Sequence, residues 1–104
     1  MLLASPIIHP TANVCYDVEV GLGSVVAPHV SIGNNVRIGS CVIIREGVII
    51  ESNVQIADYA VVGPRAILFD GSIITEAQCV PAATLVDGYA HWSALVRNLN
   101  RNCT

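Results

Sequence analysis

Residues 31–56, SIGNNVRIGSCVIIREGVIIESNVQI, carry isoleucine at every sixth position. These isoleucines are Ile32, Ile38, Ile44, Ile50 and Ile56. A helix repeats every ~3.6 residues and a strand every second residue, so neither has a period of six. The same frame, extended both ways, gives Ile, Leu or Val at 14 successive positions from residue 8 to residue 86. A repeat of this regularity decides the fold before any other signal is considered.

A second position of the repeat is also constrained, four residues after each aliphatic residue. It is small or β-branched from Ala12 through Val48 and Ala66 to Ser72, and Gln78 and Thr84 follow. Gly, Ala, Glu or Asp recurs directly after the aliphatic residue. The pattern resembles the hexapeptide repeat of the bacterial acyltransferase superfamily over residues 8–91. This resemblance implies a left-handed parallel β-helix.

The repeat has a simple physical interpretation. Each hexad supplies one short strand and one turn, and three hexads close a triangular coil, so residues 18 apart stack at the strand spacing of about 4.8 Å. We therefore expect an all-β fold, a left-handed parallel β-helix of about five coils over residues 8–91, after a lead-in of residues 1–7. The column Asp17, Asn35, Asn53 and Gly71 has residues that tolerate positive φ in the turns.

The pattern changes near the C-terminus. Trp92, Leu95, Val96 and Leu99 follow helical spacing, which predicts a short amphipathic helix between residue 91 and about residue 101, within a C-terminal segment 92–104. We expect this helix to cover the open end of the prism or the flank of a neighbouring molecule, and so to protect an exposed strand edge.

Composition narrows the class of protein. The chain is 53% hydrophobic and 12% charged, with a mean hydropathy of +0.60. No run of 18 apolar residues occurs, so we expect no membrane-spanning helix. The net charge is −3 with no lysine and five scattered arginines, which argues against nucleic-acid binding. The first residues lack a basic segment and the four cysteines form no C-x-x-C pair, so we expect a cytoplasmic protein with free thiols.

The residue before each inward aliphatic residue points outward and sorts into three faces. The first face carries Val25, Ile43, Val61 and Cys79. The second face carries Asn13, Ser31, Ile49, Ile67 and Leu85. The third face carries Glu19, Arg37, Gln55, Ile73 and His91 and is mainly polar. Exposed apolar surfaces such as the first and second faces normally bind a partner. We therefore expect a homotrimer that forms through Val25, Ile43 and Val61 on the first face and through Ile49, Ile67 and Leu85 on the second. The family that the repeat resembles is also usually trimeric.

The corner between the two apolar faces, called here the His29 corner, holds the candidate site. Its residues include His29, Arg45, Glu46 and Arg65 in successive coils. The resemblance implies a site between subunits, where a histidine accepts the proton of a sugar hydroxyl or amine that attacks an acyl thioester. We take His29 as the candidate catalytic residue and Arg45, Glu46 and Arg65 as substrate-binding residues.

The usual base of the family follows the inward aliphatic residue by two places. The matching residue here is Ser52, and this chain has neither an inserted acceptor loop nor the usual terminal turn. Two hypotheses therefore stay open: an acetyltransferase using acetyl-CoA on a small sugar or amine, with Arg97 and Arg101 near the coenzyme, or a non-catalytic trimeric scaffold or binding module. We expect no bound cofactor.

A metal-dependent enzyme is a third and weaker hypothesis. Asp58 and Glu76 stand 18 residues apart, so they would either bind a cation or form a pair of solvated carboxylates. The spread of His9, His29 and His91 over five coils argues against a shared zinc ion, because four coil spacings amount to nearly 20 Å.

Overall fold

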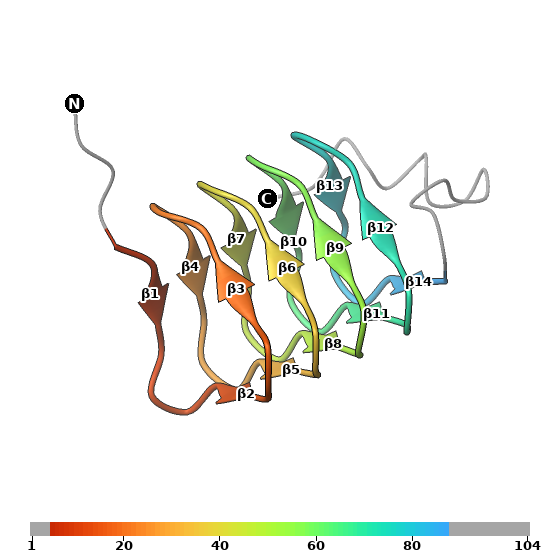
Figure 1. Ribbon diagram of the computed structural model, residues 1–104. Helices are drawn as coiled ribbons and strands as arrows, with labels where there is room; N and C mark the ends of the chain where they lie inside the picture. Colours follow the sequence, from red (N-terminus) through yellow and green to blue (C-terminus); the bar gives the residue numbers. More distant parts are fainter. Residues whose placement is uncertain (1–4, 88–104) are drawn as a thin grey trace.

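The computed structural model describes residues 5–87 and shows a triangular prism of stacked coils (Figure 1). The described residues contain no helix, and all their regular structure is in two-residue strands. The strands are β1 (Ile7–Ile8), β2 (Asn13–Val14), β3 (Glu19–Val20), β4 (Val25–Val26), β5 (Ser31–Ile32), β6 (Arg37–Ile38), β7 (Ile43–Ile44), β8 (Ile49–Ile50), β9 (Gln55–Ile56), β10 (Val61–Val62), β11 (Ile67–Leu68), β12 (Ile73–Ile74), β13 (Cys79–Val80) and β14 (Leu85–Val86).

The strands stack into three parallel sheets, one for each side of the prism. The first face is the sheet β1-β4-β7-β10-β13, the second is β2-β5-β8-β11-β14, and the third is β3-β6-β9-β12. Paired residues stand 18 apart, as in Val25 with Ile43 and Ser31 with Ile49. The fourteen strands make between four and five coils, so the expected left-handed parallel β-helix is confirmed. The expected C-terminal helix lies outside the described residues.

The core is the column of inward side chains along the prism axis. Both constrained positions of the hexad contribute: the aliphatic residue, such as Ile44, and the smaller one four places later, such as Val48. From Val26 to Val86 the aliphatic residues of the frame are buried. The narrow prism admits one aliphatic and one small residue from each side of a coil, which is why the sequence period is so strict.

The corners contain residues with positive φ, three positions after each inward aliphatic residue from Val14 to Val80. The expected column is confirmed, with φ of 56° at Asp17, 61° at Asn35, 63° at Asn53 and 79° at Gly71. The other two corners do the same with less suitable residues, such as Tyr59 at 65°. From Asn35 onward, the N–H of each such residue donates to a backbone carbonyl of the preceding coil, for example from Tyr59 to Ser40 at 3.0 Å and from Asn53 to Asn34 at 2.9 Å. These bonds impose the left-handed conformation where the residue type does not favour it.

The cysteines depart from expectation at one position. Cys15 and Cys41 are free thiols. Cys79 is disulfide-bonded, so the expectation of free thiols throughout is wrong for this residue.

Within residues 5–87 no helix is long and apolar enough to cross a membrane.

Candidate functional site

The His29 corner holds the residues singled out in the sequence. His29, Gly47, Arg65 and Ala83 form its positive-φ column, with φ between 58° and 73°. The N–H of Gly47 donates to the carbonyl of Pro28, and that of Arg65 to the carbonyl of Glu46. Proline followed by a residue of positive φ is typical of a type II turn, which projects the second side chain outward from the prism.

The His29 imidazole is solvent-exposed on this corner. Its backbone N–H donates to Thr11 Oγ1 at 3.0 Å, a side-chain substitute for the carbonyl that holds the equivalent turns in the later coils. The turn is thus fixed by the first coil while the imidazole ring extends into solvent. An imidazole ring nitrogen can accept a proton from a bound ligand.

Arg65 lies two coils beyond His29, and its side chain packs over Gly47, which lies in the coil between them. A Cβ placed on Gly47 would lie 3.4 Å from Arg65 Cγ, so the glycine leaves space for the aliphatic part of the arginine. In the coil between them, Arg45 Nε lies 4.0 Å from Glu46 Oε1, and both side chains are about half exposed. Such an exposed pair stabilises little, so both charges are available to a ligand or to a neighbouring subunit.

The structure therefore brings the four predicted residues to one corner, in consecutive coils. Their chemical roles are not tested by this placement. The two coenzyme-binding candidates, Arg97 and Arg101, lie outside the described residues.

Ser52, which stands where the family places its base, is at a different corner, between the second and third faces. Its Oγ accepts a hydrogen bond from the backbone N–H of Asn34 at 3.1 Å. A serine hydroxyl has no basic site near neutral pH, and this one is used to hold two coils together. Ser52 itself therefore cannot serve as the general base.

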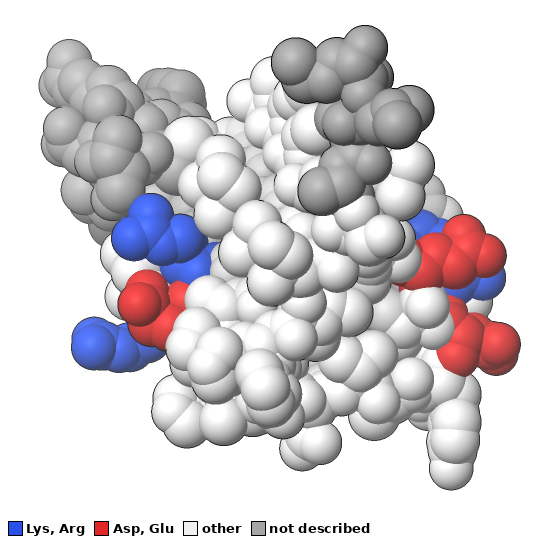
Figure 2. Space-filling model, turned by 90° about the vertical axis from the view of Figure 1, so that its left-hand side faces the viewer, with Lys and Arg blue, Asp and Glu red and all other residues white. Residues whose placement is uncertain are grey.

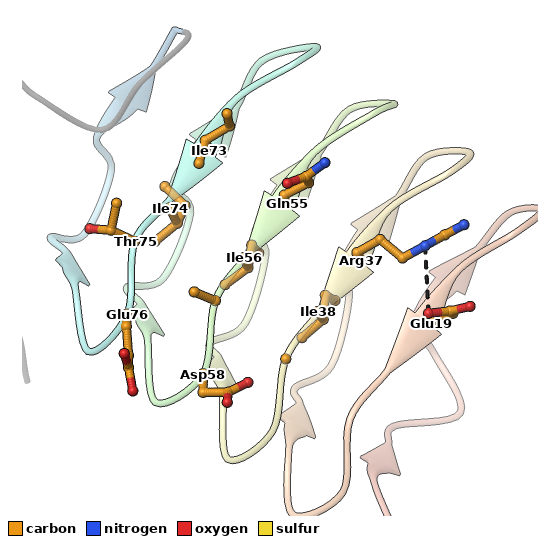
Figure 3. Close-up of a pocket in the computed structure, with 12 residues that line it drawn as sticks. Glu19, Arg37, Ile38, Gln55, Ile56, Asp58, Ile73, Ile74, Thr75 and Glu76 are labelled. Carbon is orange, nitrogen blue, oxygen red and sulfur yellow. Dashed lines mark ion pairs between the residues drawn. The ribbon is translucent and has the colours of Figure 1, made fainter.

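A shallow groove of about 520 Å³ lies along the third face and the corner that joins it to the first face (Figure 3). The outward residues of the face, which are Glu19, Arg37, Gln55 and Ile73, line one side, and Asp58, Thr75 and Glu76 line the other. The sequence pointed to two of these residues, Asp58 and Glu76, as a carboxylate pair, but it did not predict a groove here.

In the wall of this groove, two successive coils pack closely at Gly39. Gly39 has no room for a Cβ, since the Asp58 carboxylate lies over it. Asp58 Oδ1 accepts the N–H of Ser40 at 2.8 Å, which holds this carboxylate against the wall. At the other end, Arg37 Nε lies 3.5 Å from Glu19 Oε1 (Figure 3). The described residues contain no group of three or more His, Cys, Asp or Glu arranged for a metal ion.

Comparison with known proteins identifies the fold. No family model matches the chain, and no curated protein matches it. Among solved structures, a variant of GDP-perosamine N-acetyltransferase from Caulobacter crescentus, in complex with CoA and GDP-perosamine, superposes with a TM-score of 0.61 at 23% identity, over 84% of this chain and 50% of that chain. This likeness confirms the fold of the hexapeptide-repeat acetyltransferases.

Two further structures have lower scores. WeeI from Acinetobacter baumannii has a TM-score of 0.46 at 18% identity, over 79% of this chain and 52% of that one. A putative acetyltransferase from Bacillus cereus has a TM-score of 0.42 at 20% identity, over 93% of this chain and 84% of that one. The chain spans about half the length of the Caulobacter enzyme and of WeeI.

Proposed function

We propose that the protein is an acetyl-CoA-dependent acetyltransferase that modifies a small sugar or amine and works as a homotrimer. The observation that carries the proposal is the His29 corner, where an exposed imidazole lies in one column with Arg65, with Glu46 at the same corner in the coil between them, flanked by two apolar faces. The solved structure with the same fold is an N-acetyltransferase in complex with CoA and a sugar nucleotide, which supports this class of reaction.

The apolar faces support the trimer. Val25 and Ile43 on the first face, and Ile49 and Leu85 on the second, are exposed, while Val61 and Ile67 are half-buried. Two such faces around one corner suit a threefold assembly in which the corner points to the axis. Residues of two subunits would then line each site, and Arg45, Glu46 and Arg65 would contact the substrate.

In this reaction the acceptor nitrogen or oxygen attacks the carbonyl carbon of the acetyl thioester, and the His29 imidazole takes the proton of the acceptor. The carbon–sulfur bond then breaks, and the coenzyme A sulfur leaves and receives a proton from the imidazolium. Arg45 and Arg65 would bind anionic groups of the substrate, because a guanidinium presents several donors to phosphate or carboxylate oxygens. Glu46 would bind an acceptor amine. Arg97 and Arg101 remain the candidates for contact with coenzyme A.

A second candidate function is a non-catalytic trimeric scaffold or binding module. Ser52 favours it, because this residue replaces the family's usual base and is occupied by its bond to Asn34. A cytoplasmic location stays a prediction for either function, and the disulfide at Cys79 does not fit a fully reduced set of thiols.

Titration calorimetry with acetyl-CoA and with free coenzyme A separates the two functions, followed by an assay of thiol release with sugar amines as acceptors. His29→Asn is the informative variant, since asparagine tolerates the positive φ of this turn and removes the imidazole. Tyr59→Asn is the matched control at another positive-φ corner. Saturable binding with thiol release that only His29→Asn abolishes supports the transferase. A folded protein that gives no heat with either ligand supports the scaffold.

A further inference from the structure

The inward side chains are buried at one end of the prism and partly exposed at the other. In the last coils Val80 is 0% exposed and Val86 is 1% exposed, but in the first coil Ile8 and Val14 are each 40% exposed. Three further exposed apolar side chains surround this end: Ile7, Tyr16 and Leu22. The N-terminal end is therefore an apolar surface made of residues that the repeat directs into the core.

The same end presents an unpaired backbone edge. Strands β1, β2 and β3 each stand at the margin of a sheet, with one strand neighbour among the described residues. The N–H of Ile7 donates to Ser24, that of Asn13 to Val30 and that of Glu19 to Val36, all in the second coil. Successive residues of a strand direct their N–H and C=O groups to opposite sides, so those of Ile8, Val14 and Val20 face away from the prism. Such an edge accepts another strand.

Charge does not oppose a partner on this surface. Figure 2 looks onto the N-terminal end, and the Arg, Asp and Glu side chains lie at the margins of the view, away from its centre. The first coil has two acidic residues: Asp17, which is exposed at a corner, and Glu19, which is paired with Arg37 of the second coil. An uncharged apolar surface with a free hydrogen-bonding edge requires a partner of the same kind.

We infer that the N-terminal end of a second copy of this chain binds here, with the two first coils stacked face to face. Among the described residues, this end is the surface that combines exposed core residues with free strand edges. The last coil does not match it, because its aliphatic residues are already buried. Contact between two N-terminal ends is therefore favoured over a head-to-tail stack, and its twofold symmetry closes the assembly.

The twofold geometry pairs every strand of the edge. A twofold axis that passes through one corner of the triangle and the middle of the opposite side reverses the strand direction on all three sides. If the axis passes through the His29 corner, β3 pairs with β3 of the second copy, and β1 pairs with β2. All these pairs are antiparallel, so the free N–H and C=O groups of the first coils can bond to one another.

This inference extends the proposed function without depending on it. If the chain is a trimer around the His29 corner, all three N-terminal ends lie on one side of the trimer, and the same twofold axes join two trimers into a closed hexamer. If the chain does not form trimers, the end-to-end contact alone gives a dimer. The two interfaces can therefore fail separately.

Light scattering coupled to size-exclusion chromatography tests the contact over a range of protein concentrations. We expect a hexamer that becomes a trimer in Ile8→Glu and in Val14→Glu, because a carboxylate in the stacked ends weakens association by about thirtyfold or more. Tyr59→Glu is the control, since Tyr59 is 58% exposed, more than Ile8 and Val14, but lies on a corner away from this end. It should remain a hexamer.

Circular dichroism shows whether the variants keep the strand signal, and amide hydrogen exchange gives a reading that does not depend on mutation. The amides of Ile8, Val14 and Val20 should exchange more slowly as the concentration of the unaltered protein rises. A dimer that Ile8→Glu converts to a monomer supports the end-to-end contact and refutes the trimer. An unaltered protein that stays a trimer or a monomer, with fast exchange at these three amides, overturns the inference.

Discussion

Replacing Gly63 with alanine tests the close stacking of coils at one place. Gly63 is buried, and a Cβ built on it would lie 2.7 Å from the nitrogen of Ala82, 2.8 Å from the carbonyl oxygen of Val80 and 2.9 Å from the carbonyl carbon of Pro81. All three contacts are to backbone atoms, so no side-chain rotation can relieve them. The next coil must move away by several tenths of an ångström.

The cost follows from what that movement disturbs. Overpacking of a close-packed interior costs about 1–3 kcal/mol. The movement also stretches the 2.7 Å hydrogen bond from Gly63 N to Val80 O, and one such bond contributes about 1 kcal/mol. We expect Gly63→Ala to lower the free energy of unfolding by about 2–4 kcal/mol, which is a large part of the stability of a small domain.

Gly71→Ala is the matched control. No atom lies within 4 Å of a Cβ at Gly71, but its φ is +79°. The left-handed conformation costs alanine about 1–2 kcal/mol, and the loss of chain entropy in the unfolded state returns about 0.4–1 kcal/mol. Urea unfolding followed by circular dichroism measures both variants. The close-stacking argument fails if Gly63→Ala loses no more stability than Gly71→Ala.

Three further predictions concern a corner, the core and an outer face. Ala77→Gly should raise the free energy of unfolding by about 0.5–1 kcal/mol, because Ala77 has a φ of 59° and glycine removes the strain at some cost in unfolded-state entropy; a lower urea midpoint would contradict this. Ser24→Ala should lower the free energy of unfolding by about 2–3 kcal/mol, because the buried Ser24 hydroxyl donates to Gly39 O at 2.7 Å and accepts from Val42 N at 3.0 Å. A neutral result in thermal unfolding would show that the two backbone groups find other partners. Ile43→Asp should convert the proposed trimer to lower-order species in light scattering without loss of the strand signal, because it places a charge on the exposed first face; an unchanged mass would remove this face from the interface.

The sequence predicted the fold closely because the inward residues of every hexad fill the core of the prism. Every inward aliphatic residue of the frame is the second residue of a strand, from Ile8 in β1 to Val86 in β14. The column from Asp17 to Gly71 was predictable as well, since Asn, Asp and Gly tolerate positive φ. The positive φ at Tyr59, Arg65 and Ala77 was not, because the inter-coil hydrogen bonds impose a conformation that these residue types do not favour.

The outward residues explain why the candidate site was harder to predict. Their direction follows from the repeat, so the sequence placed His29 and Arg65 at one corner. A hollow, by contrast, depends on differences in side-chain length between neighbouring coils. The groove on the third face is lined by the outward residues Arg37 and Gln55 and by the turn residues Gly39 and Ala57. The repeat accepts any of these residues at those positions, so it carried no signal for the groove.

The first coil shows that a side chain can point inward, as the hexad pattern predicts, without being buried. The frame assigns Ile8, Val14 and Val20 the same inward direction as the buried residues above them, and the structure agrees. Burial, however, needs a coil on each side of the residue, because no single coil covers its own interior. Ile8 and Val14 have a neighbouring coil on one side within the described residues and stay 40% exposed. The repeat can therefore predict which side chains point into the core, but burial of those in the first described coil needs a further layer of protein. In the contact that we propose, a second copy of the chain supplies this layer.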